Sequence, residues 1–330
     1  MNRNRANKKR TGGASARVLS RAAAGMLAAA LCFQPMTALA GPAGDSSLTS
    51  SSSNAGPGGG SGSSNSGSTG SSGGSTSVSN GSVSAVTSGL GVYRVTENEG
   101  IGAIARGVDV SYWQQNVNWS QVASDNVQFA MLATRFRGNV DPFFAMNAAN
   151  ASQAGLRLGA YIYSYATSVE MAQQEADFVL NLIKDYPISF PVVFDAEEAN
   201  TLGTLTRSQV SDVINAFCKR IQDAGYYPMV YANEYWIANK IDMSKISYDI
   251  WVAKYQQKYT YSKTSMWQAS NTGSVKGVNG NVDIDYLYKD YTQIIPGNTW
   301  RTIAGNRYYY QNHVMQKAAW INDGQNWYYM

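Results

Sequence analysis

Apolar positions in the middle of the chain follow two spacings, which predict two kinds of element. Amphipathic stretches with helical spacing occupy 143–154, 169–184 and 207–224, and Gly155 and Gly225 follow two of them as C-caps would. Short apolar runs rich in β-branched and aromatic residues are typical of buried strands. They lie at 107–111, 127–133, 158–163, 191–195, 229–231, 250–253, 266–269 and 282–288. Eight strands with helices between the earlier ones predict an α/β fold whose parallel sheet closes into a barrel.

The length of this region limits the number of helices. Only about 185 residues separate Arg106 from Asp290, which is short for a barrel in which a helix follows every strand. We therefore expect eight strands with fewer helices, the later helices being short or absent.

The first 40 residues have the features of a signal peptide. They hold seven basic and no acidic residues, an apolar run of 12 residues from Ala22 to Phe33, and then Ala38-Leu39-Ala40, a small-residue cleavage signature. The run is too short to span a bilayer as a helix. We therefore expect a secreted, cell-wall-associated protein that has no membrane span.

Composition then divides the rest of the chain into three parts. Residues 41–92 are rich in Gly and Ser and bury too little apolar surface to offset the entropy of ordering, which predicts a flexible linker. The folded catalytic domain is predicted at 93–291, and a short aromatic tail follows at 292–330.

Composition also excludes several kinds of chemistry. The single histidine among 330 residues, His313, lies in the tail, so the barrel has no imidazole for a Ser-His-Asp or Cys-His site or for a histidine-ligated zinc. The net charge of +4 comes from the first 40 residues. Without them 19 basic residues face 22 acidic ones, which argues against a nucleic-acid partner. Cys218 lies among apolar neighbours with helical spacing, which predicts a buried thiol.

Acidic residues lie at the ends of several predicted strands. Asp109 ends the first, Asp195 ends the fourth with Glu197 two residues beyond it, and Asp283 and Asp285 lie in the last. The active site of such a barrel lies at the carboxyl ends of its strands, so we expect these acids to meet at one mouth. A single acid is more often a helix cap or a surface residue. The pair at the end of a buried strand favours a functional site.

Clustered carboxylates are what glycoside hydrolysis requires. One carboxyl group, kept protonated, donates its proton to the leaving oxygen, and another stabilises or attacks the anomeric carbon. Aromatic side chains support a sugar substrate because flat rings stack on pyranose faces, although most buried rings are only core. We predict the following substrate-binding residues: Tyr112, Trp113, Tyr163, Tyr165, Tyr231, Trp251, Tyr255, Trp267 and Gln268.

Six motifs, in this order, resemble the glycoside hydrolase family 25 lysozymes, the Chalaropsis or cellosyl type of N-acetylmuramidase. The third is Phe194-Asp195-Ala196-Glu197, which matches the family's Asp-x-Glu. The resemblance covers roughly 106–290. All six lie at 107–114, 154–161, 194–197, 251–255, 267–268 and 282–285.

The resemblance implies a flattened barrel that cleaves the β-1,4 bond between N-acetylmuramic acid and N-acetylglucosamine in peptidoglycan, without a cofactor or a metal. Glu197 matches the general acid. Asp195 matches the acid that assists the anomeric centre or orients the acetamido group. Asp109 and Asp283 match supporting acids of the same mouth.

Two positions depart from the family pattern. Where the family often has a Lys-Ala-Thr-Glu-Gly type segment, this chain has Leu132-Ala133-Thr134-Arg135-Phe136-Arg137-Gly138. A basic residue, Arg135, in place of the acid predicts a changed subsite preference, for example toward muropeptide carboxylates. Glu198, directly after the acid, is an extra charge to which the sequence assigns no role.

The tail contains two segments, 300–310 and 320–330, that align at a period of 20. They resemble the choline-binding type of cell-wall repeat, whose rings hold a quaternary ammonium by cation–π attraction. Such repeats usually need three or more copies to bury their faces, so we favour a hairpin that packs on the barrel or on another chain. The candidate wall-binding aromatics are Trp300, Tyr308, Tyr309, Trp320, Trp327, Tyr328 and Tyr329, and Arg307 stands at the position that corresponds to Trp327.

Three functions follow from these features. The first is a secreted muramidase whose partner is the glycan strand of peptidoglycan, with choline or other wall polymers as partners of the tail. The second is a non-catalytic cell-wall protein that uses the barrel for sugar recognition. The third is a glycosidase of chitin-like polymers. The four acids Asp109, Asp195, Glu197 and Asp283 favour an enzyme, because a binding module does not need all of them.

Overall fold

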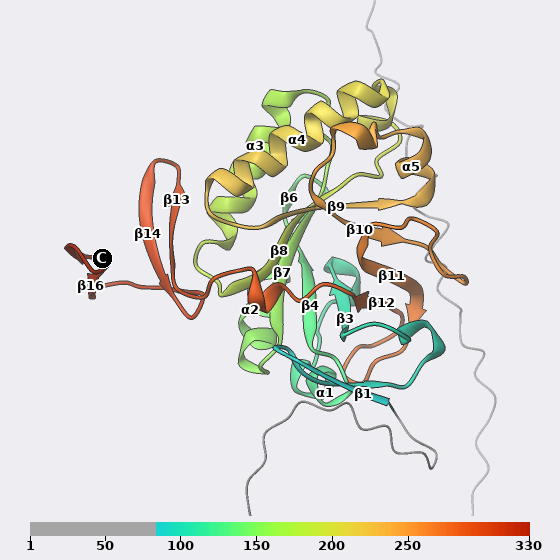
Figure 1. Cartoon of the computed structure of the whole chain (residues 1–330), viewed down its shortest axis with the longest axis horizontal. Coiled ribbons are helices and arrows are strands. Elements are labelled where there is room, and N and C mark those ends of the chain that lie inside the picture. The colour runs from blue at the N-terminus through green and yellow to red at the C-terminus, as the bar shows by residue number, and fades with distance from the viewer. Residues whose placement is uncertain (1–83) are drawn as a thin grey trace, which may run out of the picture. The chain divides into compact units, whose positions relative to one another are not determined.

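The computed structural model describes residues 84–330, so the predicted signal peptide and most of the predicted linker lie outside the described residues. Eight strands close a barrel in the order β10-β11-β12-β3-β4-β7-β8-β9 (Figure 1). This confirms the predicted barrel. The strands are β3 (Ala105–Val110), β4 (Phe129–Ala133), β7 (Arg157–Tyr163), β8 (Ile188–Asp195), β9 (Pro228–Asn233), β10 (Asp249–Ala253), β11 (Thr264–Gly273) and β12 (Val282–Leu287).

The direction of one strand corrects the sequence-based prediction. Strand β12 is antiparallel to both of its neighbours, β11 and β3, whereas the other pairs in the barrel are parallel. A fully parallel sheet was predicted. An antiparallel neighbour can be reached by a loop, and residues 274–281 join β11 to β12 without a helix. We call the end where the parallel strands finish the mouth and the end where they begin the base.

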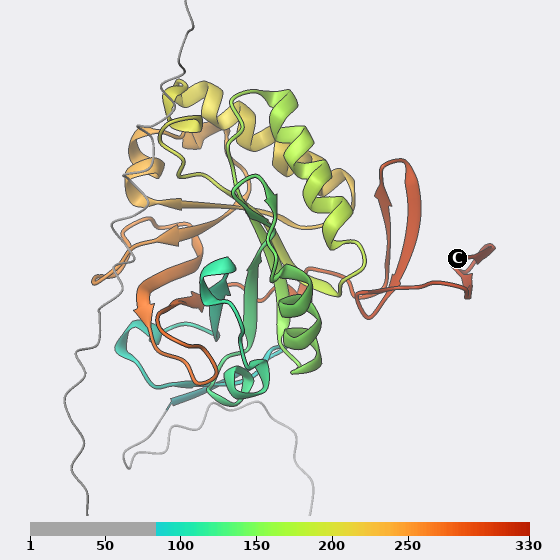
Figure 2. The ribbon, with the colours of Figure 1, turned by 180° about the vertical axis from the view of Figure 1, so that it is seen from behind.

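Helices cover part of the outside of the barrel. The three predicted helices are present as α2 (Phe144–Gln153), α3 (Val169–Ile183) and α4 (Arg207–Asp223), and α3 and α4 lie side by side in both views (Figures 1 and 2). Two short helices, α1 (Trp119–Ser124) and α5 (Glu234–Asn239), were not predicted. Serine, threonine and asparagine side chains cap the helices: those of Ser168, Thr206 and Asn233 accept backbone N–H bonds at the starts of α3, α4 and α5.

The core has two layers separated by the barrel wall. Phe129, Met131, Phe190 and Met229 fill the interior, and the rings of Phe129 and Phe190 stack with centroids 5.1 Å apart. The opposite faces of the strands pack against the helices. Strand β8 is therefore buried on both faces, which is why its sequence is a continuous apolar run rather than an alternation. Close packing also explains Gly159, because a Cβ there would lie 2.4 Å from Sδ of Met131.

A hairpin precedes the barrel. Strands β1 (Ser84–Ser88) and β2 (Gly91–Val95) pair antiparallel and include residues 84–92, which composition alone assigned to the linker. Tyr93 is fully buried. The amide of Gln128, just before β4, donates to the carbonyl of Val92, so this hairpin lies at the base of the barrel.

The tail forms two small sheets, β13 (Thr299–Ile303), β14 (Asn306–Gln311) and β15 (Val314–Met315), and then β16 (Trp320–Asn322) and β17 (Trp327–Tyr329). The first sheet packs on the base of the barrel. The guanidinium of Arg301 lies between the rings of Tyr226 and Tyr310, 3.9 and 4.3 Å from their centroids, and donates to the carbonyl of Ile188 where β8 begins. The favoured alternative, a hairpin packed on the barrel, is therefore correct for the first repeat.

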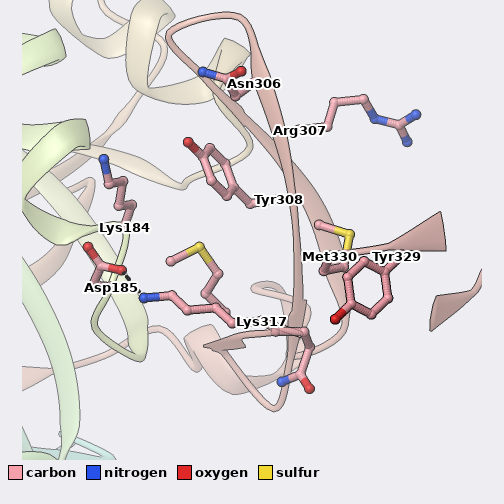
Figure 3. A pocket seen from close by; sticks show the side chains of 10 residues that line it. Lys184, Asp185, Asn306, Arg307, Tyr308, Lys317, Tyr329 and Met330 are labelled. Carbon is pink, nitrogen blue, oxygen red and sulfur yellow. Dashed lines mark hydrogen bonds and ion pairs between the residues drawn. The ribbon is translucent and has the colours of Figure 1, made fainter. Parts of the chain in front are cut away.

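The second sheet is attached more loosely. A cleft of about 510 Å³ lies between the end of α3 and the tail (Figure 3). The ion pair between Lys317 and Asp185, with Nζ and Oδ1 2.7 Å apart, crosses it. Both partners are exposed, so the pair contributes at most about 1 kcal/mol to docking. The ring of Tyr328 adds an edge contact to Trp300 at 5.0 Å.

Candidate active site

The antiparallel direction of β12 brings two of the predicted acids together at the mouth. Asp109 lies near the end of β3 and Asp283 near the start of β12, and the two are register partners. The carboxyl groups of Asp283 and Asp285 donate hydrogen bonds to the Asp109 carboxylate. In a parallel last strand Asp283 would have begun the strand at the base, far from Asp109.

Strand β8 delivers the other pair of predicted acids. Asp195 is its last residue and pairs in register with Tyr163 of β7 and Tyr231 of β9, and Glu197 follows two residues later. Asp195 is buried, and its Oδ1 has no hydrogen-bond partner among the described residues. A buried acid of this kind is more stable protonated than ionised.

A hydrogen-bond network across the barrel holds Asp109. The side-chain amide of Gln268, on β11, donates to Oδ2 of Asp109 at 2.7 Å. Its carbonyl oxygen accepts the hydroxyl groups of Tyr231 at 2.8 Å and Tyr255 at 2.6 Å. The two hydroxyls therefore fix the orientation of the Gln268 amide, so that its N–H group faces the carboxylate.

Asp285 forms a lower layer beneath these acids. It is fully buried, and its Oδ1 accepts the indole N–H of Trp251 at 3.0 Å. The sequence analysis expected Asp285 at the mouth with the other acids but gave it no catalytic role. The two-residue spacing puts both side chains on one face of β12, and that was the available signal.

The electrostatics of the cluster separate the acids into protonated and ionised groups. Burial, with the charges of Asp109 and Glu198, raises the pKa of Glu197 to about 7. Burial raises the pKa of Asp109 to about 6, because the donated hydrogen bonds oppose the effect of burial. Burial and the Asp109 charge raise the pKa values of Asp283 and Asp285 further. Asp109 is thus the acid that ionises first, and Glu197 holds its proton near neutral pH.

Glu198, which the sequence left without a role, is held at the mouth beside Glu197. Its Oε2 accepts the hydroxyl of Tyr163 and its Oε1 accepts the backbone N–H of Asn200, both at 2.8 Å. The pKa of Tyr163 is raised by burial, by the charge of Glu197 and by the hydrogen bond to Glu198. Tyr163 therefore holds Glu198 in place and lies within the electrostatic influence of Glu197.

Several of the aromatic side chains named from the sequence follow strands that end at the mouth. Tyr112 and Trp113 follow β3 in a short 3-10 helix (Tyr112–Gln114), and Trp113 is 54% exposed. Tyr163 and Tyr165 follow β7 with ring centroids 5.3 Å apart. The structure adds Phe136, which stacks on Tyr112 and which the sequence analysis missed, because a two-residue strand carries no periodicity.

Three other predicted substrate-binding rings are buried. Trp267 is 1% exposed and packs in the outer core layer against Tyr286, so it does not line the mouth. Trp251 is equally buried and forms the floor under Asp285, and Tyr231 holds Gln268. The prediction is therefore corrected for Trp267. Trp251 and Tyr231 hold Asp285 and Gln268 in place and do not offer a free ring face to a sugar.

Arg135 also differs from its prediction. Its guanidinium bonds to Oε1 of Glu175 at 2.6 Å, donates to the carbonyl of Tyr163 and lies 4.9 Å from the centroid of Tyr165. Both partners of the ion pair are almost fully buried. Arg135 thus braces the loops after β4 and β7 and cannot reach a substrate carboxylate.

Comparisons with known proteins agree with this geometry. A sequence profile of Glycosyl hydrolases family 25 matches residues 108–278. The uncharacterized protein YegX of Escherichia coli K12 is 32% identical over 189 residues, which cover 54% of this chain and 68% of that protein. Lysozyme M1 of Streptomyces globisporus is 30% identical over 195 residues, which cover 54% and 66%. The crystal structure of the CTP1L endolysin superposes with a TM-score of 0.50 and 25% identity, over 58% of this chain and 69% of that one.

Proposed function

The chain belongs to glycosyl hydrolases family 25, and on that premise we propose that it is a muramidase. It cleaves the β-1,4 bond between N-acetylmuramic acid and N-acetylglucosamine in peptidoglycan. The observation that carries the proposal is the mouth itself, where Glu197 keeps its proton near neutral pH beside the more readily ionised Asp109. The likeness to a lysozyme and an endolysin supports the same substrate.

The acids divide the chemistry between them. Glu197 donates its proton to the oxygen of the leaving sugar, which is the step that a carboxyl with a raised pKa performs. Asp109, which accepts hydrogen bonds from Gln268, Asp283 and Asp285, supplies the negative charge that stabilises the positively charged sugar ring. Asp195, protonated and without a partner for its Oδ1, orients the acetamido group of the substrate.

The test is a digest of purified peptidoglycan followed by mass spectrometry of the fragments. We expect fragments that end in reducing N-acetylmuramic acid. Glu197→Gln keeps the shape of the side chain but removes the donated proton, so its rate should fall by a factor of about 10² to 10⁴. Glu99→Gln, which changes an exposed glutamate near the base, is the matched control and should keep the wild-type rate.

Two outcomes would refute the proposal. Reducing N-acetylglucosamine ends would mean that a different bond is cut. No release from walls or from chitin-like polymers by a protein that still sediments with walls would favour the non-catalytic binding protein.

We further propose that the protein is secreted and acts at the cell wall. The basic, apolar and small-residue parts of residues 1–40 support export, and the Gly/Ser-rich composition of the residues between 41 and the β1–β2 hairpin supports a tether. No helix in the described part of the chain, residues 84–330, is long and apolar enough to cross a membrane. Amino-terminal sequencing of the protein from the medium should begin at Gly41.

The tail supports a second, wall-binding role. Trp300 and Tyr309 form a ring pair with centroids 5.2 Å apart. The guanidinium of Arg307 lies 4.3 Å from the Trp300 centroid, so a cation of this chain already occupies that pair. The equivalent pair in the second repeat, Trp320 and Tyr329 at 5.4 Å, is about two-thirds exposed. We therefore propose that the exposed pair, Trp320 and Tyr329, binds wall choline or another wall polymer.

Sedimentation with purified walls tests this role. Trp320→Ala should reduce the bound fraction several-fold, because it removes the larger ring of the exposed pair. Val314→Ala, which changes an exposed apolar residue of the first sheet, is the control. Equal binding by both variants would leave the barrel alone as the wall-binding part.

A further inference from the structure

A short hairpin on the rim of the mouth presents a cation that the proposed mechanism does not use. Strands β5 (Arg135–Phe136) and β6 (Asn139–Val140) leave the wall directly after β4 and are joined by Arg137 and Gly138. Both turn residues have positive φ, 49° and 83°. Two-residue turns of this kind favour glycine, asparagine or aspartate, so an arginine is held here against its backbone preference.

The Arg137 side chain lies on an aromatic ledge, which we define as Phe136, Tyr112 and Trp113. Its Cζ is 5.0 Å from the Phe136 centroid. Phe136 stacks on Tyr112 with centroids 4.0 Å apart and planes inclined by 15°, and Trp113 meets both rings edge-on. Tyr112 lies in the 3-10 helix that follows β3 and Phe136 in the hairpin that follows β4, so the ledge lies at the mouth end of the barrel. The contact with the Phe136 ring therefore holds the guanidinium at this end of the barrel.

The two arginines of this hairpin differ in what they bind. Arg135 is neutralised by the buried Glu175. Arg137 is exposed, and none of the ion pairs among residues 84–330 includes it. A guanidinium offers a planar set of N–H donors that matches a carboxylate bidentately.

The substrate of a muramidase carries carboxylates near the cleaved bond. Each muramyl residue bears a lactyl group, whose carboxyl is either free or linked to a peptide with carboxylates of its own. The mouth is lined by acids, so an anion of the substrate needs a cation to approach it. We propose that Arg137 on the aromatic ledge is a subsite for this carboxylate. The proposal rests on the proposed muramidase function and transfers to Arg137 the preference that the sequence suggested for Arg135.

Three substrates distinguish the sources of the carboxylate. The first is peptidoglycan with its peptides. The second is the same glycan treated with an amidase, which removes the peptides and frees the lactyl carboxylates. The third is glycan whose carboxylates have been converted to methyl amides and are neutral. The measured quantity is kcat/KM on each anionic substrate divided by kcat/KM on the neutral one.

Arg137→Gln removes the charge and should lower this ratio about tenfold, mainly through KM, because the contact is made equally in the ground and transition states. The fall should shrink at high salt, since the contact is exposed. A fall on the peptide-bearing glycan alone assigns the peptide carboxylate, and a fall on the amidase-treated glycan assigns the lactyl one. Arg94→Gln, which changes an exposed arginine of β2 at the base, is the matched control and should keep the wild-type ratio.

An unchanged ratio in Arg137→Gln, or the same fall in Arg94→Gln, would overturn the subsite. A second measurement distinguishes rejection of the Arg137 subsite from failure of the proposed muramidase function. Binding of soluble muramyl-peptide fragments is measured in the Glu197→Gln protein with and without Arg137→Gln. If the wild type cleaves no substrate, a tenfold weaker binding in the double variant still supports the subsite, and equal binding rejects it.

Discussion

Glu197 is kept protonated by its surroundings as a whole rather than by one partner. Burial has the largest effect on its pKa, and the charges of Asp109 and Glu198 add to it. No cation among the described residues contributes to this shift, and Arg135 of the rim hairpin is itself paired with Glu175. An acid with these neighbours is suited to donate a proton near neutral pH.

The first prediction concerns the pH dependence of kcat/KM. Activity requires protonated Glu197, so it should fall as the pH rises above about 7. Activity also requires ionised Asp109, so kcat/KM should fall as the pH drops below about 6. We expect a narrow bell between these limits on a soluble glycan substrate. A rate that stays level up to pH 9 would contradict the role of Glu197.

Glu198→Gln tests the electrostatic part of this account. Removing the Glu198 charge lowers the pKa of Glu197, so the alkaline limb should move to lower pH while the acid limb stays. Glu198→Asp keeps the charge and should restore the limb. Glu198 also accepts the Tyr163 hydroxyl, and Tyr163→Phe keeps the charge while removing that bond. If Tyr163→Phe moved the limb as far as Glu198→Gln, the effect would come from lost geometry rather than charge.

Cys218 is a packing residue, as its sequence setting predicted. It is fully buried in α4, and burial alone raises the pKa of its thiol. Cys218→Ser places a hydroxyl in this apolar site and should lower the free energy of unfolding by about 1 to 3 kcal/mol, while the activity hardly changes. Urea denaturation and a rate assay measure both. An inactive but folded serine variant would mean that the thiol has another role.

The sequence predicted the acids of the site better than its rings. Asp109, Asp195 and Glu197 follow from the rule that barrel sites lie at strand ends. Whether a ring such as Trp267 faces the mouth or the outer layer depends on strand register, which is set by contacts between distant segments. The bond from Gln268 to Asp109 joins residues 159 positions apart, so no local pattern indicates it.

Among the elements, long buried strands and helices were predictable and short or reversed ones were not. Strand β8 is apolar over its whole length, and α3 and α4 have clear apolar faces. Helices α1 and α5 have six residues each, too few for a periodic pattern. The direction of β12 was missed because a strand has the same alternation whichever way it runs.

The two stacked arginines of the tail allow a matched test of how its first sheet is attached. Arg301 is 1% exposed between Tyr226 and Tyr310, whereas Arg307 is exposed over Trp300. Cation–π contacts contribute about 2 kcal/mol when desolvated and about 0.5 to 1 when exposed. Arg301→Ala should therefore lower the unfolding free energy by at least about 2 kcal/mol, and Arg307→Ala by less than about 1. Equal losses in chemical denaturation would show that the sheet does not depend on its contact with the barrel.

For the whole molecule, the acid cluster makes stability depend on pH in an unusual direction. Burial raises the pKa values of Asp195, Asp283 and Asp285 above their unfolded values. The folded state then binds more protons than the unfolded state, so this contribution is complete below about pH 4 and is lost as the pH rises through the folded pKa values.

Asp285→Asn tests this linkage. The amide keeps an acceptor for the indole N–H of Trp251 and a donor for Asp109, but it cannot ionise. Relative to wild type, the variant should be more stable by about 1 kcal/mol or more at pH 8 and show no such gain at pH 4. Denaturant titrations at the two pH values measure the difference. An equal effect at both would indicate a packing change instead.

The reversed last strand also decides where the chain leaves the barrel. Because β12 starts at the mouth, it ends at the base, where the tail sheet and the β1–β2 hairpin also lie. The chain therefore both enters and leaves the barrel at the base, away from the acid cluster. The barrel can therefore be fused to other proteins through two chain connections that both lie at the base. Anchors, reporter proteins or further binding modules can be fused at either connection without covering the mouth through which a glycan strand enters.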